Sequence, residues 1–344
     1  MARFTLKTFV KLLVSLYVIV FIYALINCKS RVLFSQPDFM FEDSNSFMIS
    51  NGSRRCRLKH SELHHVKLNL DPSINLEDVA KENPHVELGG KWQPPDCEPW
   101  QKVLIIIPYR DRAYHLRVLL NRLHPMLQRQ KIAYQIVVSE QAGLDAFAKG
   151  RVVNIAFVEI LKTQNFDCII IQDVDMLPET DKNIYVCDAH ARHLAPAIDE
   201  LRYHPIYYNI YGGVVALSTS NYQLINGFSN RYAGWGNEDD DMSARTIGAG
   251  LYLTRPPYHI GRYKMVRHMK SGRSEHGYTN FMQWRHWWKI DGINNMSVIK
   301  YKVLSTTKTP LYTNITVDVG IPPDPPNPKI PEESFLWFLW FFVP

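Results

Sequence analysis

Apolar residues in the middle of the chain alternate between short continuous runs and runs with helical spacing. Residues 103–107 are all apolar, which predicts a strand buried on both faces. Segment 116–126 repeats Leu and Met at helical spacing, which predicts an amphipathic helix. The ranges 134–138 and 168–171 predict two more strands, and 147–161 between them predicts a second amphipathic helix.

This order of elements predicts an α/β fold with a mostly parallel central sheet and helices on its faces. Ligands bind such sheets at the carboxyl ends of the strands. Arg110 and Arg112 follow the first predicted strand, and Asp173 and Asp175 follow the third. No Gly-x-Gly-x-x-Gly pattern follows the first strand, which disfavours a dinucleotide oxidoreductase.

The two ends of the chain differ from this pattern. Residues 9–27 form an apolar stretch of nearly the minimum membrane-spanning length, with basic residues at and before its start. We predict a cytoplasmic tail at 1–8, an uncleaved signal anchor at 9–27, a polar stem at 28–95 and a lumenal catalytic domain at 96–322. A cleaved signal peptide is the alternative. The proline-rich and aromatic tail, 323–344, is too short in its apolar part to span a membrane and either docks on the domain or touches lipid.

Charge and cysteines narrow the class of protein. The net charge of +6 is scattered along the chain without a basic block, so we predict no nucleic-acid partner. Beyond Cys28, at the membrane edge, four cysteines predict two disulfides in an oxidising compartment, with three pairings open. These four are Cys56, Cys97, Cys168 and Cys187, and glycosylation sequons lie at Asn51, Asn295 and Asn314.

Asp173-Val174-Asp175 is the first candidate site. Alternation along a strand would place both carboxylates on one side, with Val174 pointing away. Two carboxylates that close repel unless a cation lies beside them, so the motif suits a divalent cation that also holds a diphosphate. The alternative is an ordinary polar turn.

The run 235–241 is the second candidate site. Its four consecutive carboxylates, 238–241, open a predicted helix at 240–249, and capping explains only one or two of them. Trp235 offers a flat apolar face for a sugar ring. Crowding raises the pKa of at least one carboxylate, which can then accept a hydroxyl proton.

Two further candidates are weaker alone. His268 becomes a metal ligand only together with the Asp pair. Trp284 belongs to an aromatic cluster with His286, Trp287 and Trp288, for which core packing and a sugar-stacking wall are both open.

From Cys97 to Gly320 these residues resemble the beta-1,4-galactosyltransferase family of Golgi enzymes. The matching motifs are Ile107-Pro108-Tyr109-Arg110-Asp111-Arg112, Leu123-His124-Pro125, Asn154-Ile155-Ala156-Phe157, Asp173-Val174-Asp175, Tyr211-Gly212-Gly213-Val214, Asn226-Gly227-Phe228, 234–241 and 311–318. The resemblance implies a GT-A type nucleotide-sugar-binding fold, a manganese ion and inverting transfer from a UDP-sugar to a terminal N-acetylglucosamine. It also implies a type II Golgi membrane protein with its catalytic domain in the lumen.

The resemblance also implies roles for individual residues. Donor binding falls to Pro108, Tyr109, Arg110, Arg112, Phe147, Lys149, Asp173, Val174, Asp175, Ile210 and Gly213. Metal binding falls to Asp175, Met265 and His268. Acceptor binding falls to Trp235, Glu238, Asp239, Phe281 and Trp284; the catalytic residues are Trp235, Glu238 and Asp239, with Asp239 as general base. The implied disulfides are Cys56–Cys97 and Cys168–Cys187.

Departures from the family pattern affect the donor site. Lys149 stands where the family has Arg, and Tyr109 where it usually has Phe. Ile210 replaces a Tyr that abuts the 2-substituent of the donor sugar, and Ile or Leu there resembles the invertebrate N-acetylgalactosaminyltransferases. We therefore expect UDP-N-acetylgalactosamine as the donor, with UDP-galactose as the alternative. A catalytically silent glycan-binding homologue is less favoured, because Asp175, His268 and Asp239 are present.

Overall fold

The computed structural model describes residues 15, 32–37, 40–41, 55–268, 272–323 and 341–342. Within these residues no helix is both long and apolar enough to cross a bilayer. The predicted anchor, apart from Ser15, and the sequon at Asn51 lie outside the described residues, so both remain predictions.

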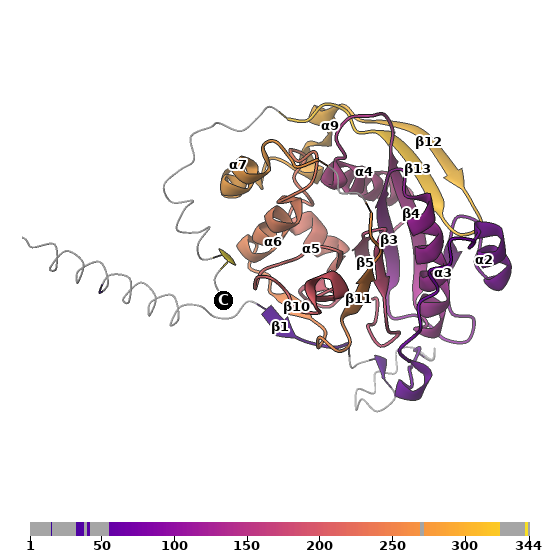
Figure 1. The fold of residues 1–344 in the computed structure, drawn as a ribbon. Coiled ribbons are helices and arrows are strands. Elements are labelled where there is room, and N and C mark those ends of the chain that lie inside the picture. The colour runs from indigo at the N-terminus through magenta and orange to yellow at the C-terminus, as the bar shows by residue number, and fades with distance from the viewer. Residues whose placement is uncertain are drawn as a thin grey trace, which may run out of the picture.

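The five predicted central elements are all present. Parallel strands β3 (Lys102–Tyr109), β4 (Ala133–Gln141) and β5 (Cys168–Gln172) form the middle of the sheet, with β3 between the other two. Helix α3 (Ala113–Arg129) follows β3, and α4 (Lys149–Leu161) follows β4. Each predicted element was confirmed, and most extend a few residues beyond the predicted ends (Figure 1).

The complete sheet is mixed rather than mostly parallel. Its strand order is β1-β10-β7-β9-β5-β3-β4-β13-β12, with β2 on β4. Strand β9 runs antiparallel to both β5 and β7, and β12 runs antiparallel to β13. The added strands are β1 (Val32–Phe34), β2 (Lys91–Trp92), β7 (Ala191–His193), β9 (Val214–Ser218), β10 (Leu253–Arg255), β12 (Lys302–Lys308) and β13 (Thr313–Asp318).

A second, three-stranded sheet lies beyond the carboxyl end of β5. It contains β6 (Met176–Pro178), β8 (Ala197–Ile198) and β11 (Arg262–Met265). Strand β11 pairs antiparallel with β6 and parallel with β8. This sheet brings a segment from late in the chain next to Asp173-Val174-Asp175.

Two hydrophobic cores cover the faces of the main sheet. Val103, Ile105 and Ile107 pack with α3 in one core, and Leu104 and Ile106 pack with α4 in the other. This alternation explains the continuous apolar run of β3. The second core also includes residues of α5 (Thr219–Leu224), α6 (Glu238–Gly248), α7 (Gly277–Met282), α8 (Trp284–Trp287) and α9 (Met296–Ile299).

The segment before Cys97 is packed onto the domain. Leu58, Leu63 and Val79 are buried in the core that contains α3, and Val79 lies on α2 (Leu76–Glu82). The predicted pairings Cys56–Cys97 and Cys168–Cys187 are both confirmed. The second half of the predicted stem is therefore part of the folded body.

Candidate active site

Asp173 and Asp175 lie in the turn between β5 and β6, not on a strand. The Asp173 amide donates to the Gly213 carbonyl (2.9 Å), and the Met176 amide donates to the Asp173 carbonyl (3.1 Å). Strand alternation predicted that the two carboxylates lie on one face, and this prediction was wrong because the residues lie in a turn. Asp173 contacts Lys149, whereas Asp175 contacts His268.

Lys149 joins the two candidate sites. Its Nζ lies 2.8 Å from Asp173 Oδ1 and 3.0 Å from Asp239 Oδ1. Burial opposes the charge on Lys149, but the two carboxylates outweigh burial and raise its pKa, so the ammonium is charged. Burial raises the pKa of Asp173 to about 7; the charges of Asp239 and Asp175 add to this, while Lys149 opposes it.

The four acids of 238–241 occupy the first turn of α6, which begins two residues earlier than predicted. Asn237, the residue before the helix, has φ +70. The Gly236 amide donates to Glu238 Oε2 (3.0 Å), and Asp239 pairs with Lys149. The Tyr207 hydroxyl donates to Asp240.

Asp241, the last of the four acids, has a structural role. It is buried, accepts from the Tyr232 hydroxyl (3.0 Å) and pairs with the buried Arg245 (2.5 Å).

Burial raises the pKa of Glu238 to about 7 and that of Asp240 to about 6. The prediction that at least one of the crowded acids has a raised pKa is therefore confirmed.

Two glycines make room for these side chains. A Cβ on Gly212 would lie 2.9 Å from Asp239 Oδ2, so the carboxylate rests directly on the glycine backbone. Gly213 has φ +86, and a Cβ there would lie 3.0 Å from Met176 Cε. Gly213 is favoured by its positive φ, and a side chain at Gly212 would displace the Asp239 carboxylate.

Strand pairing brings two of the predicted metal ligands, Asp175 and His268, into contact. Met265 on β11 pairs with Met176 on β6, and the Val266 amide donates to the Asp175 carbonyl (2.8 Å). This register brings His268 Nε2 to 3.0 Å from Asp175 Oδ2. A carboxylate, an imidazole and a weaker thioether suit a manganese-like divalent cation whose remaining positions substrate and water can fill.

Within the described residues no group of three or more His, Cys, Asp or Glu side chains forms a complete metal cage. The predicted ligand set has one carboxylate, one imidazole and Met265, so it is not a group of this kind and remains a prediction. His268 Nδ1 also lies 3.0 Å from Arg112 Nη2, which places that arginine beside the ligands. The group fits a cation that is bound together with an anionic substrate.

The predicted donor residues surround the same edge of the sheet. Pro108 and Tyr109 end β3, and Arg110 Nη1 donates to the Asp145 carbonyl (2.5 Å) with its guanidinium 5.4 Å from the Phe147 ring. Ile210 is half-buried, and its carbonyl accepts from Arg255 Nη2 (2.6 Å). Val174 is buried.

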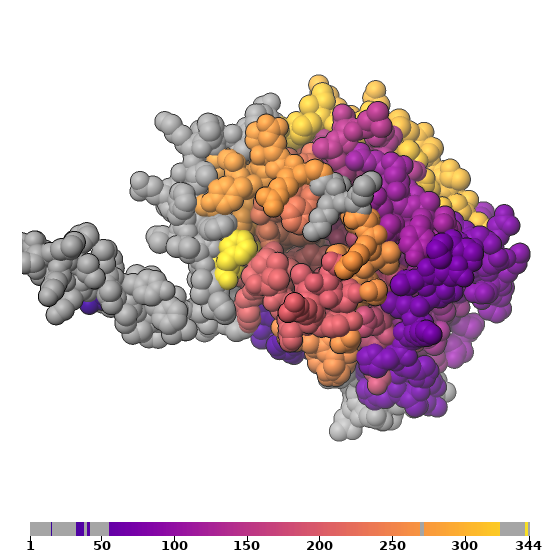
Figure 2. All heavy atoms as spheres, viewed as in Figure 1, coloured from indigo at the N-terminus to yellow at the C-terminus, as the bar shows by residue number. Residues whose placement is uncertain are grey.

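Trp235 is 52% exposed, so its ring can serve as a platform. The Trp235 amide donates to the Gly272 carbonyl (2.8 Å), and the Ser274 amide donates to the Trp235 carbonyl (2.9 Å). Figure 2 shows a hollow in the visible face between the orange segment that contains α7 and the salmon segments that precede it.

The structure does not bring Trp284 to the acids. Trp284 is buried, and a Cβ on Gly248 would lie 2.5 Å from its ring. Gly248 ends α6, about 14 Å along the helix axis from Asp239. Phe281 is fully buried, with the rings of Phe341 and Phe342 packed against it.

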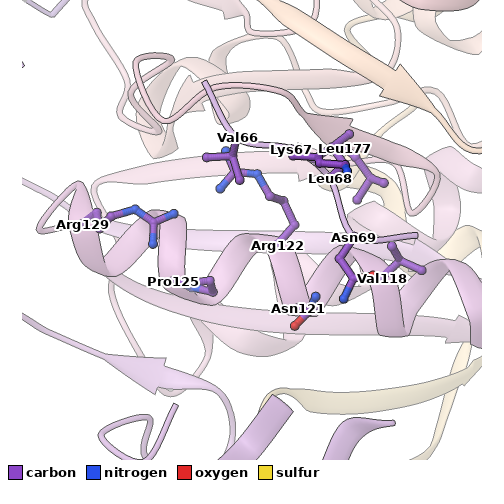
Figure 3. A pocket seen from close by; sticks show the side chains of 10 residues that line it. All are labelled: Val66, Lys67, Leu68, Asn69, Val118, Asn121, Arg122, Pro125, Arg129 and Leu177. Carbon is purple, nitrogen blue, oxygen red and sulfur yellow. The ribbon is translucent and has the colours of Figure 1, made fainter. Parts of the chain in front are cut away.

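A separate pocket of about 240 Å³ lies between α3 and residues 66–69 (Figure 3). Arg122 and Arg129 line it, and both pair with the buried Asp181 (2.8 Å each). These arginines bind Asp181, which is not one of the candidate site carboxylates, and stabilise the packing of α3. The pocket is therefore not the active site.

The comparisons with known proteins agree with this geometry. The family model for the N-terminal region of glycosyl transferase group 7 matches residues 56–188, and the model for the N-terminal domain of galactosyltransferase matches residues 192–269. Beta-1,4-galactosyltransferase 3 of Rattus norvegicus is 42% identical over 262 residues, which are 75% of this chain and 66% of that protein. The chain belongs to the beta-1,4-galactosyltransferase family. Beta-1,4-galactosyltransferase 2 of Homo sapiens is also 42% identical, over 72% of this chain and 67% of that protein.

Solved structures support the fold of this family member. The catalytic domain of Drosophila beta-1,4-galactosyltransferase 7 in complex with xylobiose covers 63% of this chain and 93% of its own, with a TM-score of 0.52 and 24% identity. A mutant of that enzyme in complex with manganese, UDP-Gal and xylobiose gives a TM-score of 0.54. The domain therefore has the predicted GT-A type glycosyltransferase fold.

The raised carboxyl pKa values of this family member predict a pH effect on stability. Between about pH 4 and pH 7 the folded protein holds protons on Glu238, Asp173 and Asp240 that the unfolded chain has lost. Stability is therefore lost as the pH rises toward 7. The buried His124 and His193 act in the opposite direction near pH 5.5, because burial lowers their pKa values, so the carboxyl effect is measured as a difference between wild type and a variant.

Glu238→Gln should raise Tm at pH 8 by about 2–4 °C more than at pH 5.5. Glu77→Gln, at an exposed position, should change neither Tm. An equal effect of Glu238→Gln on Tm at both pH values would contradict the assignment.

Proposed function

We propose that this protein is an inverting glycosyltransferase. It transfers N-acetylgalactosamine from UDP in β1,4 linkage to a terminal N-acetylglucosamine of a glycoprotein or glycolipid glycan. The observation that carries the proposal is the contact of one ammonium, Lys149 Nζ, with both Asp173 and Asp239. A donor-side carboxylate and a candidate base are thereby held within reach of a single reaction centre.

The residues divide into a donor side and an acceptor side. Arg110, Arg112 and Lys149 supply positive charge next to the position of the diphosphate, and Pro108 and Tyr109 lie at the same strand end. Manganese, when bound by Asp175, Met265 and His268, would add charge that stabilises the leaving UDP. The relative solved with manganese and UDP-Gal supports this choice of metal and donor class.

Asp239 is the general base of the proposed reaction. Its carboxylate takes the proton of the acceptor 4-hydroxyl as that oxygen attacks the anomeric carbon on the face opposite UDP, which inverts the configuration. Glu238 accepts hydrogen bonds from acceptor hydroxyls, and the exposed ring of Trp235 stacks on the sugars. Lys149 holds Asp239 in place before the acceptor arrives.

Donor choice is assigned to Ile210. Its backbone is held by Arg255, so a substitution changes the side chain and leaves the loop anchored. An aliphatic side chain leaves apolar room for an N-acetyl methyl where a tyrosine would place a phenol. Such pocket changes alter discrimination by about 1–3 kcal/mol, so some use of both donors is expected.

The donor assignment is tested by Ile210→Tyr. Wild type should use UDP-N-acetylgalactosamine at least as well as UDP-galactose. The substitution should shift the ratio of kcat/KM values toward galactose by about 10-fold to 200-fold, because it crowds the acetamido group. Direct competition between the two donors, with product masses as readout, measures the ratio.

Ile210→Leu is the matched control and should leave the ratio nearly unchanged. A wild type that strongly prefers UDP-galactose, with a ratio that Ile210→Tyr does not move, would overturn the donor assignment. Galactosyl transfer to the same acceptor is then the function, and the names of the similar proteins favour this second candidate. Absence of both transfer and UDP-sugar hydrolysis would point to a silent glycan-binding protein.

The proposed location is the Golgi membrane, with the catalytic domain in the lumen. The two disulfides support an oxidising compartment. Residues 9–27 are proposed as the anchor. Asn295 and Asn314 are partly exposed sequon positions and, with Asn51, are proposed sites of N-glycosylation.

A further inference from the structure

The last described residues are Phe341 and Phe342. They are separated in sequence from the described range that ends at residue 323, but they pack inside the domain. Phe341 is 0% exposed and belongs to the same core as α6 and α7. Its carbonyl accepts a hydrogen bond from Asn209 Nδ2 (2.6 Å). Figure 2 shows the two residues, in yellow, against the salmon and orange segments of the molecule.

The surface that receives them is aromatic. The Phe341 and Phe342 rings lie 5.2 Å and 6.1 Å from the Phe281 ring, both edge-on. The Phe342 ring lies 4.9 Å from the ring of Tyr207, also edge-on. Edge-to-face packing at these distances is favourable beyond the apolar area that it buries. We call Tyr207, Asn209 and Phe281 the aromatic cradle.

The aromatic cradle adjoins the catalytic carboxylates. The Tyr207 hydroxyl donates to Asp240, which follows the proposed base Asp239 on α6. Phe281 is among the residues assigned to the acceptor under the proposed function, on which this inference rests. The Phe341 and Phe342 rings both contact the buried Phe281 ring, so an acceptor that reaches Phe281 from this side has to displace them.

We propose that the aromatic cradle is a binding site for the chain's own Phe341-Phe342 and that its occupation excludes the acceptor. The tail is thus an internal competitor of the acceptor glycan and does not compete with the UDP-sugar. One backbone hydrogen bond and the contacts of two rings hold Phe341-Phe342 in the cradle, and an acceptor at sufficient concentration would displace them.

The test compares the full chain with a chain that lacks residues 341–344. Transfer to a β-glycoside of N-acetylglucosamine is measured with saturating UDP-sugar. The shortened chain should show an acceptor KM lower by roughly threefold to thirtyfold, with donor KM and UDP-sugar hydrolysis unchanged. An acceptor KM that is unchanged or higher, with an unchanged Tm, would overturn the proposal.

Two further experiments test the same proposal if the shortened chain folds poorly. Phe342→Ala removes only the half-buried ring and should lower the acceptor KM in the same direction. The peptide acetyl-Trp-Phe-Phe-Val-Pro should inhibit Phe342→Ala competitively against the acceptor, whereas acetyl-Trp-Ala-Ala-Val-Pro should not. Inhibition by neither peptide, with acceptor KM unchanged, would overturn the proposal.

Equilibrium binding separates this inference from the proposed function. If neither the full nor the shortened chain binds the N-acetylglucosamine glycoside at millimolar concentration, the acceptor assignment fails. If both bind it with the same Kd, the acceptor assignment stands and the tail does not compete.

Discussion

Asp239→Asn should lower kcat by about 10²-fold to 10⁴-fold, the contribution that a positioned general base makes. The amide keeps the shape of the carboxylate but cannot take a proton, so the loss falls on the transition state. Binding of the UDP-sugar should change by less than about threefold, because the donor is assigned to other residues. Single-turnover transfer and equilibrium binding of UDP, measured on the same preparation, separate the two effects.

Glu238→Gln is the comparison for this substitution. Glu238 is the neighbouring carboxylate on α6 and accepts from the Gly236 amide rather than from Lys149. Its substitution should raise the acceptor KM as well as lower turnover. Near wild-type turnover in Asp239→Asn would move the role of base to another carboxylate of the same helix turn.

Asp175→Asn or His268→Ala should remove at least about 99% of the activity at a manganese concentration that saturates wild type. Each substitution removes one of the two strong ligands of the proposed site, whose atoms lie 3.0 Å apart. Activity should return in part at higher manganese, because the affinity for the metal is lowered. A titration of activity with manganese in metal-free buffer measures the shift.

His65→Ala is the matched control, because His65 is an exposed histidine away from these ligands. It should leave both activity and the manganese titration unchanged. All variants should keep the Tm of the metal-free wild type within about 3 °C, since the site is partly exposed. Full turnover of wild type in excess chelator would refute the metal assignment.

The sequence predicted the central elements because residues buried on both faces of a sheet leave continuous apolar runs. Residues 103–107 and 168–171 carry this signal, and both are strands. Strand direction leaves no comparable signal, so β9, which follows Gly213, could not be recognised as antiparallel. The prediction of a mostly parallel sheet therefore missed the antiparallel strands.

The roles of single site residues remain predictions, and the sequence did not indicate the contacts between them. Lys149 lies 24 residues from Asp173 and 90 from Asp239, and no local spacing indicates a contact over such separations. The same holds for Tyr207 with Asp240 and for Asn209 with Phe341. These are tertiary contacts between segments that are distant in the sequence, so they are defined only in the folded chain.

Packing of the segment before Cys97 limits where the protein can be shortened for production. A recombinant domain that starts at residue 96 would leave Cys97 without its partner Cys56 and would uncover the apolar side of α3 that Leu58, Leu63 and Val79 occupy. It would also remove β2 from the edge of β4. Such a fragment should aggregate and form mispaired dimers through its odd thiol. A start at or before Val32 keeps the Cys56–Cys97 disulfide and β2, and it also keeps β1 on β10 and the buried Met40 and Phe41.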